Sequence, residues 1–250
     1  MHQPNPQAVA APAAHTRNFV LVHGGFHGGW CWDAVALRLR ALGHKVYTPT
    51  QTGCGERAHL LARTITLDTF VDDIADVVLR EDLHDVVLVG HSFGGSVISG
   101  VADRMPERIR QLVYLDAIML ENGQTVFDLL DPDVVQARLK AADDSGGLAI
   151  APPPAGVFGI RDAAQLQFVQ ARLTSHPLGT YTSPLQLAHP VGNGLPAVYV
   201  QCTDPVYAAL QPSRDWVAAH GIRRIDIATG HDAMVTAPDL LAHMLVELGD

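Results

Sequence analysis

In "VVLVGHSFGGSV", residues 86–97, four apolar residues run directly into Gly-His-Ser-Phe-Gly. A continuous apolar run is typical of a strand that is covered on both faces. The small residues that follow predict a helix over 93–104. The sequence therefore places Ser92 on a strand-to-helix turn, the context in which G-x-S-x-G presents a nucleophile.

A serine in such a turn has a strained backbone, so its neighbours must lack bulky side chains if strand and helix are to pack closely. Gly90 and Gly94 meet this requirement. The first N–H groups of the helix would also favour negative charge above Ser92. Two alternatives are a glycine-rich turn that merely contains a serine and a dinucleotide loop, whose G-x-G-x-x-G pattern "GHSFGG" does not match. We interpret Ser92 as a nucleophile.

Apolar and β-branched runs recur along the chain, with helical patterns or long connections between them. Strands are predicted at 18–22, 45–50, 86–89, 111–116, 197–203 and 223–228. Helical spacing of apolar residues or small residues predicts helices near 32–42, 70–78, 93–104 and 238–249. This alternation predicts an α/β fold with right-handed crossovers and a doubly wound, mainly parallel, six-stranded sheet.

One segment interrupts this alternation and divides the predicted domain. Residues 117–190 contain the helical pattern "DAAQLQFVQARL" and are punctuated by glycine and proline. We predict that they form a helical cap over the carboxyl edge of the sheet, where ligands bind in such folds. Residues 17–116 and 191–250 would form the core. The Ala-, Pro- and Gln-rich residues 1–16 are expected to form a disordered tail.

Composition argues against several classes of partner. The 250 residues include 17 Lys and Arg against 26 Asp and Glu, a net charge of −9, so nucleic acid and anionic membranes are not expected partners. No run approaches the roughly 18 apolar residues of a membrane span. Cys31, Cys54 and Cys202 suggest neither a disulfide framework nor a zinc site. We expect a cytoplasmic protein without metal, and the oligomeric state stays open.

A serine at its ordinary pKa needs a base. The segment "ATGHDAMVTAP" places His231 in a loop after the last predicted strand. Because strand ends converge at one edge of a parallel sheet, we predict His231 as the base, although a loop histidine is more often simply on the surface. His91 adjoins Ser92, but neighbouring side chains at such a turn diverge, so we expect it to pack under the loop.

An oxyanion needs two donors. One should be the N–H of Phe93, directly after the serine. The other should come from the loop after the first strand, "HGGFHGGW" at 23–30, where Gly25 is the candidate. The alternative is an ordinary glycine-rich turn without such a role.

The three segments "VLVHGGFHGGWCW", "VGHSFGGSV" and "GHDAMVTAP", in this order, resemble the α/β-hydrolase superfamily. They most resemble its branch of plant methylesterases, hydroxynitrile lyases and related bacterial esterases. The resemblance extends from Asn18 to the end of the chain and is weakest in the cap. It implies a Ser–acid–His order of catalytic residues, no cofactor, and a sheet without the first two strands of the larger fold.

Two carboxylates lie where a predicted strand ends, and either could orient His231. Asp204 follows the strand where most superfamily members carry the acid, but the loop there is shorter than in plant relatives and Asp-Pro is a common turn pair. Asp116 closes "QLVYLD", a position that resembles the one used by some haloalkane dehalogenases. A buried carboxylate there would need a partner. We favour Asp116 and leave Asp204 open.

The resemblance also narrows the reaction. Hydroxynitrile lyases carry a lysine and a threonine where this chain has Asp232 and Gly24, and dehalogenases and epoxide hydrolases need a carboxylate in place of Ser92. Hydrolysis of a small or medium uncharged ester or lactone through an acyl-enzyme is therefore the predicted activity. A small-molecule receptor with slow hydrolysis and a C–C bond hydrolase with the same triad are the alternatives.

Several aromatic residues could line an apolar substrate pocket, although each could equally be part of the core. They are Phe26, Trp30, Phe127, Phe158 and Phe168. An apolar pocket of this kind favours a small-molecule ester as partner over a peptide.

Overall fold

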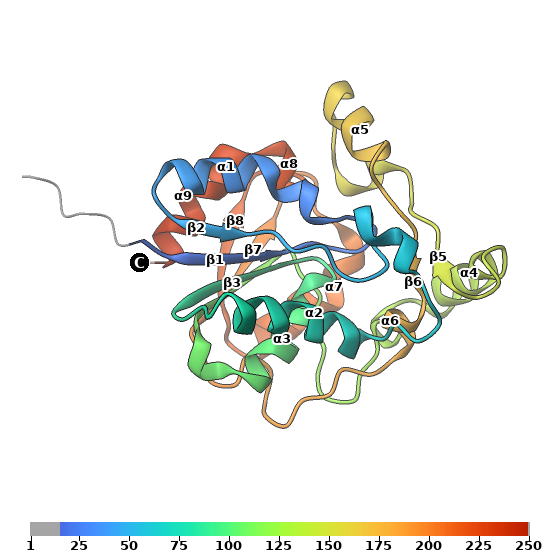
Figure 1. The fold of residues 1–250 in the computed structure, drawn as a ribbon. Coiled ribbons are helices and arrows are strands. Elements are labelled where there is room, and N and C mark those ends of the chain that lie inside the picture. The colour runs from blue at the N-terminus through green and yellow to red at the C-terminus, as the bar shows by residue number, and fades with distance from the viewer. Residues whose placement is uncertain (1–15, 250) are drawn as a thin grey trace, which may run out of the picture.

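The computed structural model describes residues 16–249, and the predicted N-terminal tail lies almost wholly outside the described residues (Figure 1). Its centre is a six-stranded sheet in the order β2-β1-β3-β4-β7-β8, in which every neighbouring pair is parallel. The strands are β1 (Asn18–Val22), β2 (Lys45–Tyr47), β3 (Val86–His91), β4 (Ile109–Leu115), β7 (Ala197–Cys202) and β8 (Arg223–Ile227). The predicted fold class is confirmed.

Helices cover both faces of this sheet (Figure 1). One face carries α1 (Asp33–Ala41), α8 (Ala233–Thr236) and α9 (Pro238–Gly249). The other carries α2 (Leu67–Arg80), α3 (Gly94–Arg104) and α7 (Gln211–Ala219). Helix α7 was not predicted, because Val217 is the one buried apolar residue in its sequence "QPSRDWVAA", which leaves no helical spacing of buried apolar residues.

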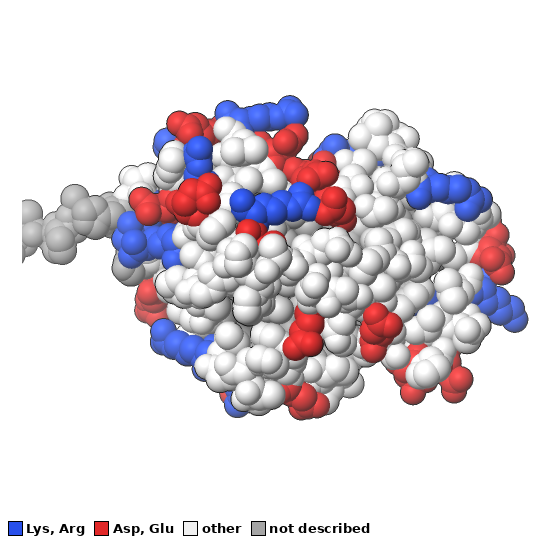
Figure 2. Space-filling model, turned by 90° about the horizontal axis from the view of Figure 1, so that it is seen from below, with Lys and Arg blue, Asp and Glu red and all other residues white. Residues whose placement is uncertain are grey.

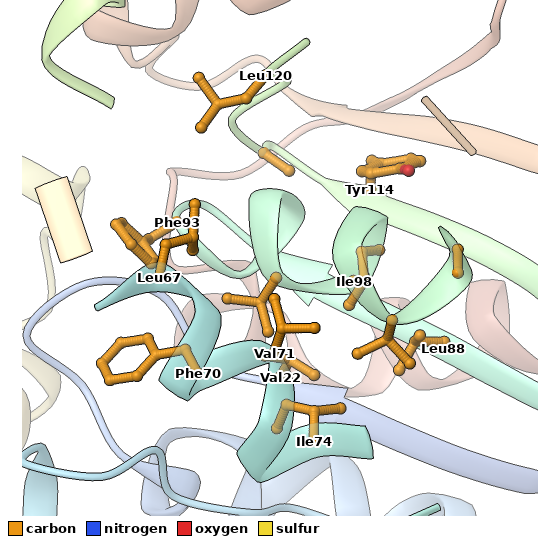
Figure 3. Packing of buried hydrophobic residues seen from close by; sticks show 14 of the residues in the cluster. Val22, Leu67, Phe70, Val71, Ile74, Leu88, Phe93, Ile98, Tyr114 and Leu120 are labelled. Carbon is orange, nitrogen blue, oxygen red and sulfur yellow. The ribbon is translucent and has the colours of Figure 1, made fainter. Parts of the chain in front are cut away.

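Alternation along the strands builds a core on each face, since successive side chains of a strand point to opposite sides. In β3, Val86 and Leu88 join the core under α2 and α3, whereas Val87 and Val89 join the core under α1 and α9. Figure 3 shows Leu88 in the core under α2 and α3, among side chains that come from the sheet and from these helices. Residues covered on both sides explain why the strands read as continuous apolar runs.

Helices α2 and α3 lie close together. A Cβ atom on Gly100 of α3 would lie 2.6 Å from Cγ2 of Val71 in α2, which is too short for any side chain. Helix α2 begins after Thr66, whose side-chain oxygen accepts a hydrogen bond from the N–H of Thr69. Small residues in α3 and a capped, amphipathic α2 thus hold the helix that follows Ser92 against the sheet.

The strand order reverses between β1 and β3, because the chain goes from β1 out to β2 and then crosses back to β3. In open α/β sheets ligands bind at the carboxyl ends of the strands beside such a reversal. Here those ends lead into the loop of residues 23–29 and the turn at Ser92. The topology therefore brings the predicted oxyanion loop and the predicted nucleophile together.

The chain between β4 and β7 lies at the carboxyl edge of the sheet (Figure 1). It contains α4 (Pro132–Asp143), β5 (Ala149–Ile150), α5 (Ala163–Gln170), β6 (His176–Pro177) and α6 (Gly179–Thr182). Strands β5 and β6 pair antiparallel, so the insertion is not purely helical. Its treatment as a cap separate from the core stays a prediction.

The surface agrees with a chain of mixed charge. On the face shown in Figure 2, basic side chains lie scattered among acidic ones. Arg104, for example, pairs with Asp68 and Asp72. Within residues 16–249, no helix combines the length and the apolar character needed to cross a bilayer.

Candidate active site

Ser92 lies on a sharp turn between β3 and α3 and has a positive φ of 51°. Its N–H donates to the carbonyl oxygen of Leu115 at 3.1 Å, and its own carbonyl oxygen accepts from the N–H of Ile118 at 2.8 Å. For a residue other than glycine, this conformation costs about 1–3 kcal/mol and persists only where the surroundings impose it. The hydrogen bonds to both sides of the β4 terminus supply that constraint.

The glycines around Ser92 are required by close backbone approach. A Cβ atom on Gly90 would lie 2.5 Å from the carbonyl oxygen of Gly94, and one on Gly95 would lie 2.5 Å from that of Ile118. No side chain fits at these distances without displacing the backbone. The packing requirement that the sequence suggested is therefore present on both sides of the serine.

His231 and Asp116 are joined by a short polar contact. Nδ1 of His231 lies 2.7 Å from Oδ2 of Asp116, and the two side chains are 1% and 0% exposed. Asp204, the other candidate, lies on the surface and pairs with Arg161 at 2.7 Å. The structure thus brings Asp116 to His231 and leaves Asp204 in an exposed ion pair.

The ring of His231 packs against two residues that line the cavity beside Ser92. It stacks on Tyr207 with ring centroids 4.2 Å apart and lies 6.0 Å from the ring of Phe158. Both aromatic residues line a cavity of about 50 Å³ to which Ser92 also contributes. Since Nδ1 faces Asp116, Nε2 is the ring nitrogen available on the other side.

The predicted oxyanion residues are also neighbours. A Cβ atom on Gly25 would lie 3.9 Å from Cβ of Phe93, and both residues line the cavity. The next residue, Phe26, has a positive φ of 69°, and its N–H donates to Nδ1 of His176 in the cap at 3.2 Å. The N–H of Phe26 is therefore already used, which leaves Gly25 as the donor candidate of this loop.

His27, in the same loop, and Asp232 form a buried pair that the sequence analysis did not predict. Nδ1 of His27 lies 2.8 Å from the carbonyl oxygen of Gly25, and Nε2 lies 3.0 Å from Oδ2 of Asp232. Burial opposes protonation of His27, but Asp232 outweighs it and raises the pKa of His27. A protonated His27 donates from both nitrogens and so anchors the Gly25 carbonyl to the residue after His231. The only signal in the sequence was Asp232, the acidic residue directly after His231.

Two other buried histidines of the site, His23 and His91, have lowered pKa values. Burial lowers the pKa of His23 to about 4, and its Nε2 accepts from the N–H of Gln51 at 3.1 Å. Burial and the neighbouring His231 hold the pKa of His91 well below its usual range. His91 donates from Nε2 to the carbonyl oxygen of His231 at 3.0 Å, which agrees with its predicted place under the loop.

The predicted pocket residues divide into two groups. Phe26 and Phe158 line the cavity. Trp30, Phe127 and Phe168 lie outside its described lining. Trp30 stacks on His27 and contacts Phe168, and Phe127 packs against Tyr181. Three further lining residues, Arg138, Tyr181 and Tyr207, escaped notice. They lie on helix and loop segments of unremarkable sequence, and only the folded chain brings them to Ser92.

One group of side chains could hold a metal ion on distance alone. His91, His231 and Asp232 are buried and place potential ligand atoms within 4.8 Å of one another. However, Nε2 of His91 already binds the His231 carbonyl, and Oδ2 of Asp232 already pairs with His27. Nδ1 of His91 and Oδ1 of Asp232 have no hydrogen-bond partner among the described residues. The expectation of a protein without metal or cofactor stays a prediction.

Comparison with known proteins agrees with this architecture. A model of the alpha/beta hydrolase family matches residues 19–244. A carbendazim hydrolyzing esterase from Nocardioides sp. (strain SG-4G) is 41% identical over 247 residues, which cover 93% of this chain and 99% of that protein. Methylesterase 7 of Arabidopsis thaliana is 26% identical over 253 residues, covering 94% of this chain and 96% of that protein.

A solved structure gives the same result. An extracellular alpha/beta-hydrolase from a Paenibacillus species, described as sharing structural and functional homology with tobacco salicylic acid binding protein 2, superposes with a TM-score of 0.81. It is 28% identical, and the match covers 93% of this chain and 99% of that one. The resemblance to plant methylesterases and bacterial esterases is thus confirmed. The chain belongs to the alpha/beta hydrolase family and is a hydrolase of the carboxylesterase type.

Proposed function

We propose that this protein hydrolyses small, uncharged carboxylic esters through an acyl-enzyme formed on Ser92. The observation that carries this proposal is the 2.7 Å contact between His231 and Asp116, beside a cavity that also exposes the strained Ser92. A buried carboxylate on Nδ1 favours the tautomer whose Nε2 can accept a proton.

The reaction runs in two halves. Oγ of Ser92 attacks the acyl carbon while its proton passes to Nε2 of His231, and the N–H groups of Gly25 and Phe93 stabilise the oxyanion. The C–O bond to the alcohol breaks, and the alcohol leaves with that proton. Water then attacks the acyl-enzyme, gives a proton to His231, and releases the carboxylic acid as Ser92 regains its proton.

The cavity supports a small-molecule substrate. Its volume of about 50 Å³ and its apolar walls, including Phe26, Phe158 and Leu129, suit a compact ester better than a peptide. Relatives are named for hydrolysis of carbendazim and of pyrethroids and for methylesterase activity. We therefore infer a methyl or other small-alkyl ester as the substrate class, with carbendazim among the first compounds to assay.

The test is hydrolysis of p-nitrophenyl acetate and butyrate, combined with labelling by a fluorophosphonate and mass spectrometry. Ser92→Ala should lower kcat by about 10³-fold or more and abolish labelling. Ser175→Ala, a serine of the cap outside the cavity lining, serves as the matched control and should retain activity and labelling. Label on another residue, or full activity in Ser92→Ala, would overturn the proposal. A stoichiometric burst with negligible turnover would favour the receptor alternative.

A further inference from the structure

The cavity beside Ser92 contains a basic side chain that the esterase reaction itself does not require. Arg138 projects from α4, a helix on which Ala142 is the one buried residue. It nevertheless reaches inward and lines the same cavity as Ser92, Gly25 and Phe93. Its Cζ lies 5.3 Å from the ring centroid of Tyr181.

The guanidinium of Arg138 is incompletely paired. Its Nη1 is buried and has no hydrogen-bond partner among the described residues. Within residues 16–249, no carboxylate forms an ion pair with it. A buried donor without an acceptor costs about 1–3 kcal/mol, more when it is charged. An arginine in this condition has donor capacity left for a molecule that enters the cavity.

The charge of Arg138 affects the pKa values of neighbouring side chains. Burial raises the pKa of Tyr181, and the charge of Arg138 and a side-chain hydrogen bond between Arg138 and Tyr181 oppose that rise. Burial also lowers the pKa of His176, the residue that holds the oxyanion loop, and Arg138 lowers it further. Apolar residues such as Val126, Leu129 and Phe158 make up much of the remaining wall. Arg138 is the one charged residue among the described lining residues, and a cation beside apolar walls is a strong point of recognition, because water competes less there than at an open surface.

We propose that Arg138 is a specificity-determining residue that binds a second hydrogen-bond acceptor of the substrate, separate from the scissile carbonyl. This inference rests on the proposed esterase function and refines its substrate class. The preferred ester would carry a ketone or another neutral carbonyl oxygen a few bonds from the reacting carbon. A guanidinium donates a charge-assisted hydrogen bond to such an oxygen.

Matched esters separate this recognition from general reactivity. On the acyl side, methyl 4-oxopentanoate is compared with methyl 4-methylpentanoate, which has the same skeleton without the acceptor. On the alcohol side, 3-oxobutyl acetate is compared with 3-methylbutyl acetate. Monomethyl succinate adds a carboxylate in place of the ketone and shows whether the acceptor is neutral or anionic.

The measured quantity is the ratio of kcat/KM between the two members of each pair. In the parent we expect a ratio of about tenfold or more in favour of the acceptor ester in at least one pair, the usual strength of a charge-assisted hydrogen bond. Arg138→Met should bring that ratio close to one. Arg138→Lys, which keeps the charge without the planar fork, should retain part of it.

Lys140→Met is the control, because Lys140 lies on the same helix, is exposed, and does not line the cavity. It should keep the ratio of the parent. An unchanged ratio in Arg138→Met, or an equal loss of activity on all esters, would overturn the inference while leaving the esterase proposal intact.

Binding gives a second measurement that needs no turnover. Calorimetry with Ser92→Ala protein should show tighter binding of the acceptor ester than of its apolar partner, and Ser92→Ala/Arg138→Met should lose the difference. If the parent hydrolyses none of the esters, the esterase proposal fails, and this binding comparison alone decides the role of Arg138.

Discussion

Nε2 of His91 lies 3.0 Å from the main-chain carbonyl oxygen of His231, so the residue before the candidate nucleophile holds the loop of the candidate base. The two residues are separated by 140 positions in the chain. This hydrogen bond ties the end of β3 to the loop after β8 from beneath the reacting groups. His91 is thus a positioning residue, and it is buried with its other ring nitrogen unpartnered among the described residues.

Removal of this hydrogen bond should disturb the placement of His231. We expect His91→Ala to lower kcat about tenfold or more with a smaller change in KM, because a small displacement of a base is costly. His91→Gln can donate to the same carbonyl and should recover part of kcat. Steady-state kinetics on p-nitrophenyl acetate provide the measurement, with exposed His243→Ala as control. Equal losses in the alanine and glutamine variants would contradict a positioning role.

The two candidate acids should behave differently. Asp116→Asn removes the charge that faces Nδ1 of His231 and should reduce kcat by about 10²–10⁴-fold. Asp204→Asn breaks only an exposed ion pair with Arg161, worth about 0–1 kcal/mol, and should leave kcat within a factor of about two. The same ester assay applied to both variants checks this. A larger loss in Asp204→Asn than in Asp116→Asn would exclude the assignment.

The close approach at Gly90 predicts a loss of stability. Gly90→Ala forces a Cβ to within 2.5 Å of the Gly94 carbonyl oxygen and should reduce the free energy of unfolding by about 1–3 kcal/mol. Gly156→Ala is the matched control, because its nearest atom, Cδ2 of Leu166, lies 3.9 Å away. Urea unfolding followed by circular dichroism measures both. Similar urea midpoints for the two variants would contradict this prediction, because they would mean that the backbone at Gly90 can shift at little cost.

Burial of neutral His23 predicts a dependence of stability on pH. Its pKa is lowered from 6.5 to about 4 by burial, so between these values the unfolded chain binds a proton that the folded protein does not. Stability must therefore fall as the pH drops from 6.5 to 4, by up to about 3 kcal/mol from this residue. His23→Gln cannot take up that proton and should lose correspondingly less. The free energy of unfolding in urea at pH 7.5, 6.5, 5.5 and 4.5 gives the comparison; parallel curves would refute it.

The sequence alone determined the sheet and the positions of several site residues, because these depend on local patterns. Apolar runs covered on both faces identified the strands, and glycines at close-approach positions identified the turn at Ser92. The loop after the last strand pointed to His231 by topology alone. Helix α7 could not be predicted, because Val217 is its one buried apolar residue.

The folded chain was needed to show which carboxylate contacts His231 and which side chains surround the reacting groups. Asp116 and Asp204 both end strands, and it is the course of the chain that buries one and pairs the other with Arg161. His27 pairs with Asp232, which lies 205 positions away in the chain. Arg138 reaches the cavity from a helix whose sequence looks solvent-exposed. Such contacts join segments that are far apart in the chain, so no local sequence pattern predicts them.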